Sequence, residues 1–170
     1  MTIAVRETTR TDPGRGEQAS LRTWLRLLAC SNLVEREVRV RLRDRFDTTL
    51  PRFDVLAQLD AASNEADPHL TMSELSRRLM VTNGNLTALI ERLVQEGLVS
   101  RDQSPDDRRT QIVSLTVTGK RALDSMTPEH QRWIDDLFSG LTTSERRNLF
   151  ELLGKLRSSV QASLGEERPR

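Results

Sequence analysis

The residues best suited to binding chemistry lie in the segment SPDDRRTQIVSLT (residues 104–116), where Asp107 is followed by Arg108 and Arg109. The planar guanidinium group of arginine donates paired hydrogen bonds that match phosphate and carboxylate oxygens. A neighbouring carboxylate such as Asp107 can hold an arginine in place, and Pro105 favours a tight turn. Taken alone, the segment is an ordinary charged turn, so the neighbouring elements decide whether it binds an anion.

The helix expected just before this segment has one apolar and one polar face. Within NGNLTALIERLVQE (residues 83–96), apolar side chains recur at helical spacing from Leu86 to Leu93, opposite the small Gly84 and Ala88. Small residues allow a partner to approach closely, and Asn and Thr side chains suit the base edges or phosphates of DNA. A plain amphipathic helix with a solvated face is the alternative interpretation, and this helix alone does not decide between the two.

Catalytic and metal-binding patterns are missing from the sequence. His69, expected in a polar connection, and His130, expected in an exposed helical or kinked stretch, are the only histidines. Neither has a cysteine, histidine or carboxylate at metal-ligand spacing. No phosphate-binding loop, nucleophile motif or glycine-rich dinucleotide turn occurs. The sequence therefore predicts a protein that is not an enzyme and that has no metal or cofactor.

Periodicity and capping residues predict the helices that position these groups. Apolar residues at three-and-four spacing predict a first helix over 20–46, and Pro51 fits the first turn of a second helix over 52–62. Two capping boxes, in which a threonine and a glutamate satisfy free N–H groups, open a third helix at 71 and a last helix at 142. The remaining elements are a helix over 82–96 stopped by Gly97, the strands LVSRDQ and TQIVSLT, and a helix from Thr116 or Thr118 to about Phe138.

This order of elements predicts a mainly α fold with a small β-hairpin wing. Residues 50–118 would form a winged helix-turn-helix lobe, the arrangement in which a second helix enters a groove of DNA and a hairpin lies beside it. Helices over 20–46 and 118–165 would form a helical dimerisation lobe. Both lobes would belong to a single domain over residues 20–165.

Length, charge and cysteine content limit the classes to which the protein can belong. The 170 residues suit one domain, and the net charge of +1 means that an anion-binding surface must be local. All basic residues except Lys120 and Lys155 are arginine, an excess that suits phosphate binding and that a GC-rich genome would equally produce. No stretch reaches the roughly 18 apolar residues of a membrane helix, and a single cysteine fits a reducing cytoplasm. Residues 1–19 and 166–170 are expected to be a flexible arm and a frayed tail.

The segment LTMSELSRRLMVTNGNLTALIERLVQEGLVSRDQSPDDRRTQIVSLTVTGKRAL resembles the DNA-binding core of MarR-type transcriptional regulators. The resemblance covers about residues 70–123, and the flanking helices follow the family's order over about 20–165. The Asn-Gly-Asn start of the helix departs from the Ser or Thr that is more usual there, which leaves the base sequence that it binds open. The most specific match comprises Asp107, Arg108, Arg109, Ile112, Leu115, Thr116 and Gly119, with further matches at Arg92-Leu93 and from Gly97 to Arg101.

The resemblance implies a homodimeric repressor that binds a palindromic site in double-stranded DNA. In that family the first and last two helices of each subunit interlock, the recognition helices enter successive major grooves, and the wing arginines reach the minor groove. The DNA-binding residues carried over are Thr82, Asn83, Asn85, Thr87 and Arg92 on the recognition helix, Arg101 near the base of the wing, and Asp107, Arg108 and Arg109 in the wing.

A small-molecule effector that binds between the lobes and releases the repressor is also implied. The first two helices look similar to those of regulators of aromatic-acid catabolism, so the expected effector is an aromatic acid or an aromatic acyl-CoA thioester. For Trp24 and Phe53, a place in the core or in the dimer contact is the alternative. The expected pocket draws flat apolar walls and arginine countercharges from Arg22, Trp24, Arg26, Leu28, Arg52 and Phe53.

Two other functions stay open. Some relatives sense peroxide through a cysteine in the first helix, where Cys30 lies. Cys30 is expected on the apolar face, where a thiol is inert, and the chain has no tyrosine to activate it. A winged helix can also serve protein–protein assembly. DNA binding would depend steeply on salt and on Arg109, whereas an assembly module would keep its partner after Arg109→Ala.

Overall fold

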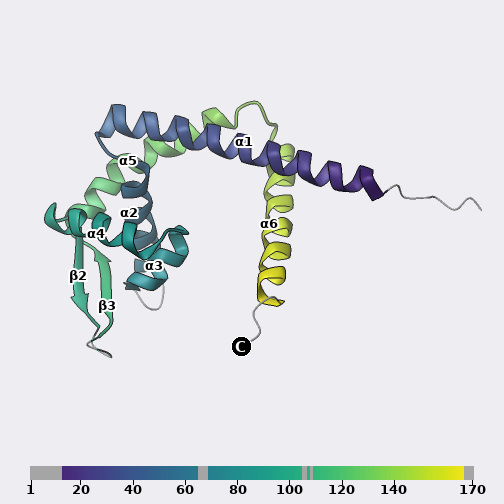
Figure 1. The fold of residues 1–170 in the computed structure, drawn as a ribbon. Helices are drawn as coiled ribbons and strands as arrows, with labels where there is room; N and C mark the ends of the chain where they lie inside the picture. Colours follow the sequence, from purple (N-terminus) through teal and green to yellow (C-terminus); the bar gives the residue numbers. More distant parts are fainter. Residues whose placement is uncertain (1–12, 65–68, 105–106, 108, 167–170) are drawn as a thin grey trace, which may run out of the picture.

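The computed structural model describes residues 13–64, 69–104, 107 and 109–166 of the chain. In Figure 1 the long first helix lies across the top, a lobe of helices and a small sheet hangs from its C-terminal end, and the last helix stands apart. This is the mainly α fold with a wing that the sequence predicts. The elements are α1 (Pro13–Phe46), α2 (Leu50–Ser63), β1 (Leu70–Thr71), α3 (Met72–Leu79), α4 (Asn83–Gln95), β2 (Val99–Gln103), β3 (Gln111–Leu115), α5 (Val117–Leu137) and α6 (Thr143–Glu166).

The first helix is longer than expected, because α1 begins at Pro13 and not near residue 20. Part of the segment expected to be a flexible arm is therefore helical. The second half of α1 packs on the lobe, where Val38 and Leu42 are buried. Its first half overhangs, and there Trp24 is 54% exposed and Leu28 is 40% exposed. The overhang thus presents apolar side chains that the described part of the chain leaves uncovered.

Side-chain caps set the starts of several helices. Thr71 Oγ1 accepts a hydrogen bond from the Glu74 N–H (3.2 Å), and the Glu74 carboxylate accepts one from the Thr71 N–H (2.9 Å), which confirms the capping box before α3. These bonds from Thr71 hold the pKa of Glu74 below its ordinary value. The same exchange links Thr142 and Glu145 before α6. Pro51 lies in the first turn of α2, where a missing N–H costs little, as predicted.

The sheet has three antiparallel strands in the order β1-β3-β2, one more than the predicted hairpin. The additional strand, β1, pairs Leu70 with Val113 and Thr71 with Ile112. Two residues are too few for a strand pattern to be recognised, so the sequence placed Leu70 in a polar connection. Leu70 is in fact buried, and its strand ties the start of α3 to the inner strand of the wing.

The hydrophobic core lies where α2, α3, α4, the sheet and α5 meet beneath the second half of α1. On α4 the predicted apolar face is confirmed, since Leu86, Ile90 and Leu93 are buried and Leu89 packs against them. Burying a leucine or isoleucine side chain stabilises a fold by about 1.5–3 kcal/mol. The inner face of α4 is therefore firmly anchored, which fixes the direction in which its outer face points.

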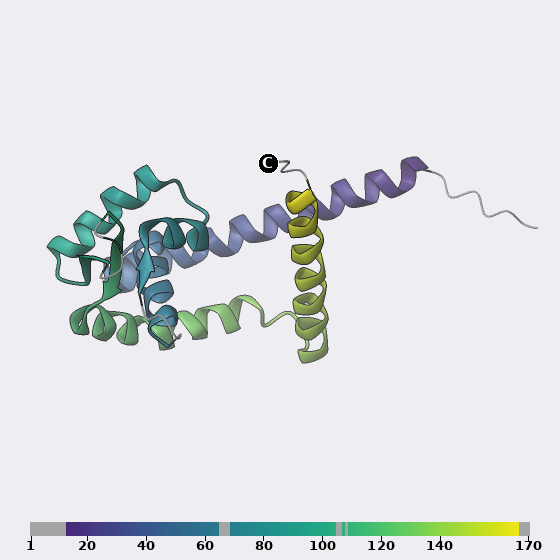
Figure 2. The same ribbon diagram turned by 90° about the horizontal axis from the view of Figure 1, so that it is seen from below.

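The last helix, α6, has no helix packed along it within the described chain. Among residues 143–164 only Leu149 is partly buried, while Phe150 is 79% exposed and Leu164 is 62% exposed. Seen from below in Figure 2, α6 stands away from the winged lobe. An exposed apolar face of this length marks an interaction surface. None of the helices in the described residues has the apolar length needed to cross a membrane.

Candidate nucleic-acid interface

The outer face of α4 carries small and polar side chains that are open to solvent. Gly84, Asn85, Ala88 and Arg92 are exposed along it, and Thr87 is half-buried. A Cβ placed on Gly84 would meet nothing within 4 Å, so this side of the helix is free of packing. Short side chains of this kind let a helix backbone approach a groove, and the longer Asn and Arg side chains can reach acceptors there.

The two ends of α4 are built differently. Thr82 is the N-cap, but its side chain makes no capping hydrogen bond. Its hydroxyl is therefore not used to cap the helix. At the other end Gly97 has φ +71°, and the Leu98 N–H donates to the Leu93 carbonyl (2.9 Å). This left-handed turn ends the helix at the residue that the sequence indicates. The side chain of Asn83 lies outside the described residues.

The wing turn is organised by Asp107. Its carboxylate accepts hydrogen bonds from the Arg109 backbone N–H (2.9 Å) and from Thr110 Oγ1 (3.0 Å), and its carbonyl accepts one from the Thr110 N–H (2.9 Å). The sequence suggested that Asp107 could hold an arginine in place, and among the described residues it binds Arg109 through the backbone N–H and not through the guanidinium group. The Arg109 side chain is exposed. Arg108, predicted beside it, lies outside the described residues.

Arg101 is less available than expected. It lies on β2 opposite Val113 of β3 and is half-buried. Its Nε atom is buried and has no hydrogen-bond partner within the described part of the chain. The fold thus turns Arg101 partly inward, because its position on β2 faces the core, as Val99 does two residues earlier.

A junction between the end of α4 and the start of α5 was not among the predicted site residues. Thr116 Oγ1 donates to the Gly97 carbonyl (2.7 Å) and accepts from the Gly119 N–H (2.9 Å), which makes it the N-cap of α5. Gly119 packs directly on the backbone of Leu98, where a Cβ would lie 2.0 Å from the carbonyl oxygen. The Thr116-to-Gly119 spacing was the available signal, since it combines a cap residue with a glycine inside a helix.

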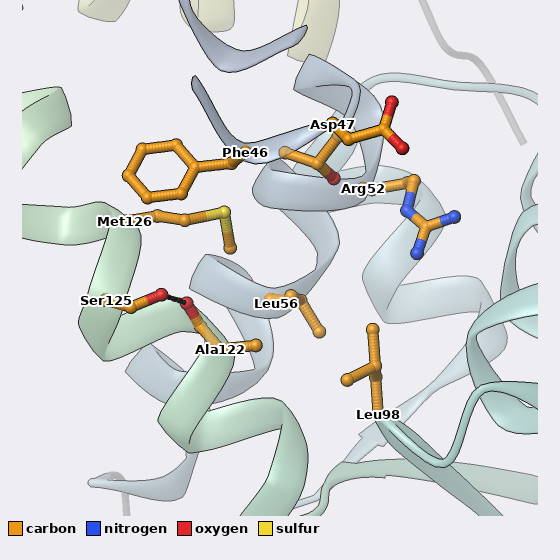
Figure 3. Close-up of a pocket in the computed structure, with 9 residues that line it drawn as sticks. Phe46, Asp47, Arg52, Leu56, Leu98, Ala122, Ser125 and Met126 are labelled. Carbon is orange, nitrogen blue, oxygen red and sulfur yellow. Dashed lines mark hydrogen bonds between the residues drawn. The ribbon is translucent and has the colours of Figure 1, made fainter. Parts of the chain in front are cut away.

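Arg52, expected to face a ligand, binds the end of the recognition helix. Its two Nη atoms donate to the two carboxylate oxygens of Glu96, the C-cap of α4, with the Nη1–Oε1 distance at 2.8 Å. This pairing with Arg52 holds the pKa of Glu96 below its ordinary value. Figure 3 shows Arg52 at a small cavity of about 170 Å³ that is also lined by Leu98 and Met126. The guanidinium charge of Arg52 is thus already compensated.

The other residues of the expected effector pocket are not brought together. Phe53 is buried in the core, and its ring stacks on His130 at a centroid distance of 4.6 Å, so the alternative of a core residue is confirmed for Phe53. His130 is half-buried within α5 and not exposed as expected, and burial lowers its pKa. The four remaining residues, Arg22, Trp24, Arg26 and Leu28, all lie exposed on the overhanging half of α1.

Cys30 and His69 are the remaining side chains with reactive groups. Cys30 is exposed in the single chain, so the expected burial against an apolar face does not occur within one subunit. His69 is exposed, and its Nδ1 lies 2.8 Å from Ser114 Oγ. Within the described residues no group of three or more His, Cys, Asp or Glu side chains could hold a metal ion.

Comparisons with known proteins agree with this geometry. Residues 48–110 match the MarR family. An uncharacterised HTH-type transcriptional regulator from Bacillus cereus is 34% identical over 134 residues, which is 78% of this chain and 85% of the relative. A MarR mutant from E. coli, solved in complex with operator DNA, superposes with a TM-score of 0.67 at 29% identity and covers 76% of this chain and 89% of its own.

A further solved structure shares the fold along most of the chain. AbsC, a MarR family transcriptional regulator from Streptomyces coelicolor, superposes with a TM-score of 0.72 at 22% identity over 95% of this chain and 99% of its own. Membership of a family of transcriptional regulators confirms the expectation that the chain is not an enzyme. On fold, wing geometry and sequence similarity together, the chain belongs to the MarR family of winged helix-turn-helix transcriptional regulators.

Proposed function

We propose that this regulator is a homodimeric repressor that binds a palindromic operator in the cytoplasm. The observation that carries the proposal is the open polar face of α4 beside a wing whose turn, built on Asp107, leaves Arg109 exposed. The E. coli relative, solved with operator DNA, supports the same use of this fold here. The residues proposed to contact bases are Thr82, Asn83, Asn85 and Thr87, with Arg92 on phosphates and Arg108 and Arg109 in the minor groove.

The uncovered faces of α1 and α6 support the homodimer. Along α6 the exposed apolar side chains recur from Phe150 through Leu153 to Val160, and Trp24 extends the apolar surface on the overhang of α1. Exposing this much apolar surface to water is unfavourable, and a second copy of the chain offers the same two faces for mutual burial. Two winged lobes held in this way would reach half-sites about 10 bp apart, one turn of DNA.

The experiment that tests the proposal is selection of bound duplexes from random DNA by the purified chain. We expect a palindrome with half-sites one helical turn apart. Arg109→Ala should then weaken binding and make it less dependent on salt, with the slope of log K against log salt reduced by about two for the two wings. Arg36→Ala, an exposed arginine on α1, is the matched control and should bind as wild type does.

The result also separates the alternatives. A protein–protein assembly module would select no duplex and would keep its partner after Arg109→Ala. Within the DNA-binding function, release through oxidation of Cys30 predicts that peroxide dissociates the complex and that Cys30→Ser abolishes this response. The exposure of Cys30 in the single chain leaves the thiol accessible before dimerisation.

For the effector, the sequence supports an aromatic acid or an aromatic acyl-CoA thioester. The supporting feature is the pair Arg22 and Arg26, which flank Trp24 on the exposed half of α1 and offer cationic groups for a carboxylate or for CoA phosphates. The test is titration of the protein–DNA complex with hydroxycinnamoyl-CoA and with the free acids. Arg22→Ala should raise the concentration needed for release, and failure of all these compounds to dissociate the complex contradicts this effector class.

A further inference from the structure

The turn between α3 and α4 presents an apolar side chain to solvent just before the recognition helix. Met80 is 92% exposed, which makes it the most exposed of the large apolar residues in the described part of the chain. Burial of a methionine side chain stabilises a fold substantially, and the single chain gains almost none of this from Met80. A lone exposed apolar residue is common on protein surfaces, but the backbone of Met80 is unusual as well.

Met80 has an unfavourable backbone conformation. It is the C-cap of α3, with φ +54° and ψ +38°, in the left-handed region that favours glycine. Among the described residues other than glycine, only Asp47 shares a positive φ, and aspartate adopts that region more readily than methionine does. Glycine at position 80 would relieve the backbone and remove the exposed apolar surface together. Because methionine is unfavourable to the fold in both respects, its side chain points to a contact outside the subunit.

Hydrogen bonds across the turn fix the backbone on both sides of Met80. Ser76 Oγ donates to the Val81 carbonyl (2.6 Å), and the Val81 N–H donates to the Ser76 carbonyl (3.2 Å). The Met80 N–H donates to the Arg77 carbonyl (3.4 Å). The turn therefore holds the main chain of Met80 in place, and the long side chain is the part that can adapt to a partner.

The same turn borders the outer face of α4. Leu79 and Val81, the two neighbours of Met80, line one cleft together with Gly84 and Asn85 from that face. When the N-terminal part of α4 enters the major groove, as proposed, Met80 lies at its leading end. The base pairs within reach of Met80 therefore adjoin those that the first turn of α4 contacts.

The chemistry of methionine limits what it can recognise in DNA. Its thioether has no hydrogen-bond donor and is a weak acceptor, so it offers little to a phosphate or to a polar base edge. The apolar group that base pairs present in the major groove is the C5-methyl group of thymine. An unbranched and polarisable side chain adapts its shape to such a group.

We propose that Met80 is a specificity-determining residue that contacts the C5-methyl group of one thymine in each half-site. The inference rests on the proposed function, because it names a base that the DNA-binding surface selects. Removing one buried methyl group weakens binding about fourfold, so the two half-sites of a palindrome together should contribute about fifteenfold.

The test replaces the thymines of the selected operator, one position at a time in both half-sites, by deoxyuridine, which removes only the methyl group. Fluorescence anisotropy with the full chain measures affinity. Wild type should lose about fifteenfold at the contacted position. Met80→Gly should lose at least as much on the thymine duplex and should bind both duplexes equally, whereas its Tm should equal or exceed that of wild type. Asp47→Gly, at the other positive φ, is the matched control and should keep the whole loss on deoxyuridine.

Three outcomes would overturn the inference: half-sites without thymine, no loss on deoxyuridine in wild type, or an equal loss of affinity in Met80→Gly on both duplexes. The last is the result expected of a contact with deoxyribose. Met80→Asn, which also accepts a left-handed backbone, repeats the comparison if Met80→Gly does not fold.

The same measurements separate this inference from the proposed function. If a palindrome is selected and no thymine depends on Met80, the inference alone fails. If the selected site is not a palindrome, the proposed homodimer on a palindromic operator fails, and deoxyuridine in that site still tests Met80. If no duplex is selected, both fail.

Discussion

Replacing Gly119 by alanine tests the junction between the recognition helix and α5 most directly. The added methyl group would lie 2.0 Å from the Leu98 carbonyl oxygen, 2.8 Å from Leu115 Cδ1 and 2.9 Å from the Leu98 carbonyl carbon. A leucine methyl group can move aside, but two of these three atoms are backbone. The first turn of α5 must therefore separate from Leu98, and the Thr116 cap that links it to Gly97 must be disturbed with it.

Three contributions set the size of the effect. Overpacking a core costs about 1–3 kcal/mol, and contact with rigid backbone places this case at the upper end. Separation also strains the hydrogen bond from the Thr116 N–H to the Leu98 carbonyl, 3.2 Å long and worth about 1 kcal/mol. Alanine in a helix recovers about 1 kcal/mol over glycine. The net loss is about 3 kcal/mol in the free energy of unfolding, or about 6–12 °C in Tm for a chain of this size.

Thermal unfolding followed by circular dichroism measures this loss. All samples need the same protein concentration, because the Tm of a dimer depends on it. Gly84→Ala is the matched control, since its methyl group meets nothing within 4 Å, and its Tm should equal or exceed that of wild type. If Gly119→Ala melts together with wild type, α5 and Leu98 are not in rigid contact and the reasoning is wrong.

Three further changes have expected outcomes. Thr71→Ala removes the capping box with Glu74 and should lower stability by about 1 kcal/mol, measured by urea unfolding at pH 7. Asp107→Ala removes two hydrogen bonds of the wing turn, so affinity for the selected operator should fall with little change in Tm; unchanged affinity would show that the turn does not position Arg109. Asp54→Asn should raise Tm at pH 7.5 and not at pH 4. The raised pKa of Asp54 means that its contribution to stability is present below pH 3.8 and is lost as pH rises through about 6. A Tm difference that is the same at both pH values would contradict this.

The parts of the fold that sequence predicted well are those that depend on local chemistry. The caps at Thr71 and Thr142 and the stop at Gly97 act within a few residues, so each was visible in the chain itself. For α5 the sequence left Thr116 and Thr118 open, and the structure shows that Thr116 is the cap. The apolar face of α4 was equally visible, because its period is that of the helix. Once these elements were in order, the winged layout followed.

The parts that could not be predicted depend on contacts between distant residues. Nothing in the sequence near Arg52 indicates that its charge is taken by Glu96, 44 residues later. The surroundings of Asp54 are built from residues of four helices, α1 to α4, and the exposure of Cys30 depends on how far α1 overhangs the lobe. Sequence resemblance placed the effector residues on α1 and α2 as a group, but only the packing shows that Phe53 belongs to the core.

The separation of α6 from the wing has a genetic consequence. The apolar side chains of α6 lie on a helix that stands away from the winged lobe (Figures 1 and 2). Under the proposed pairing, a chain with a defective wing such as Arg109→Ala therefore keeps the whole of its dimerisation surface. In a cell that makes the intact chain and the variant in equal amounts, random pairing yields mixed dimers as half of all dimers. Each mixed dimer has only one wing that can bind DNA. Wing variants should thus be dominant-negative, whereas variants that disrupt α6 should be recessive.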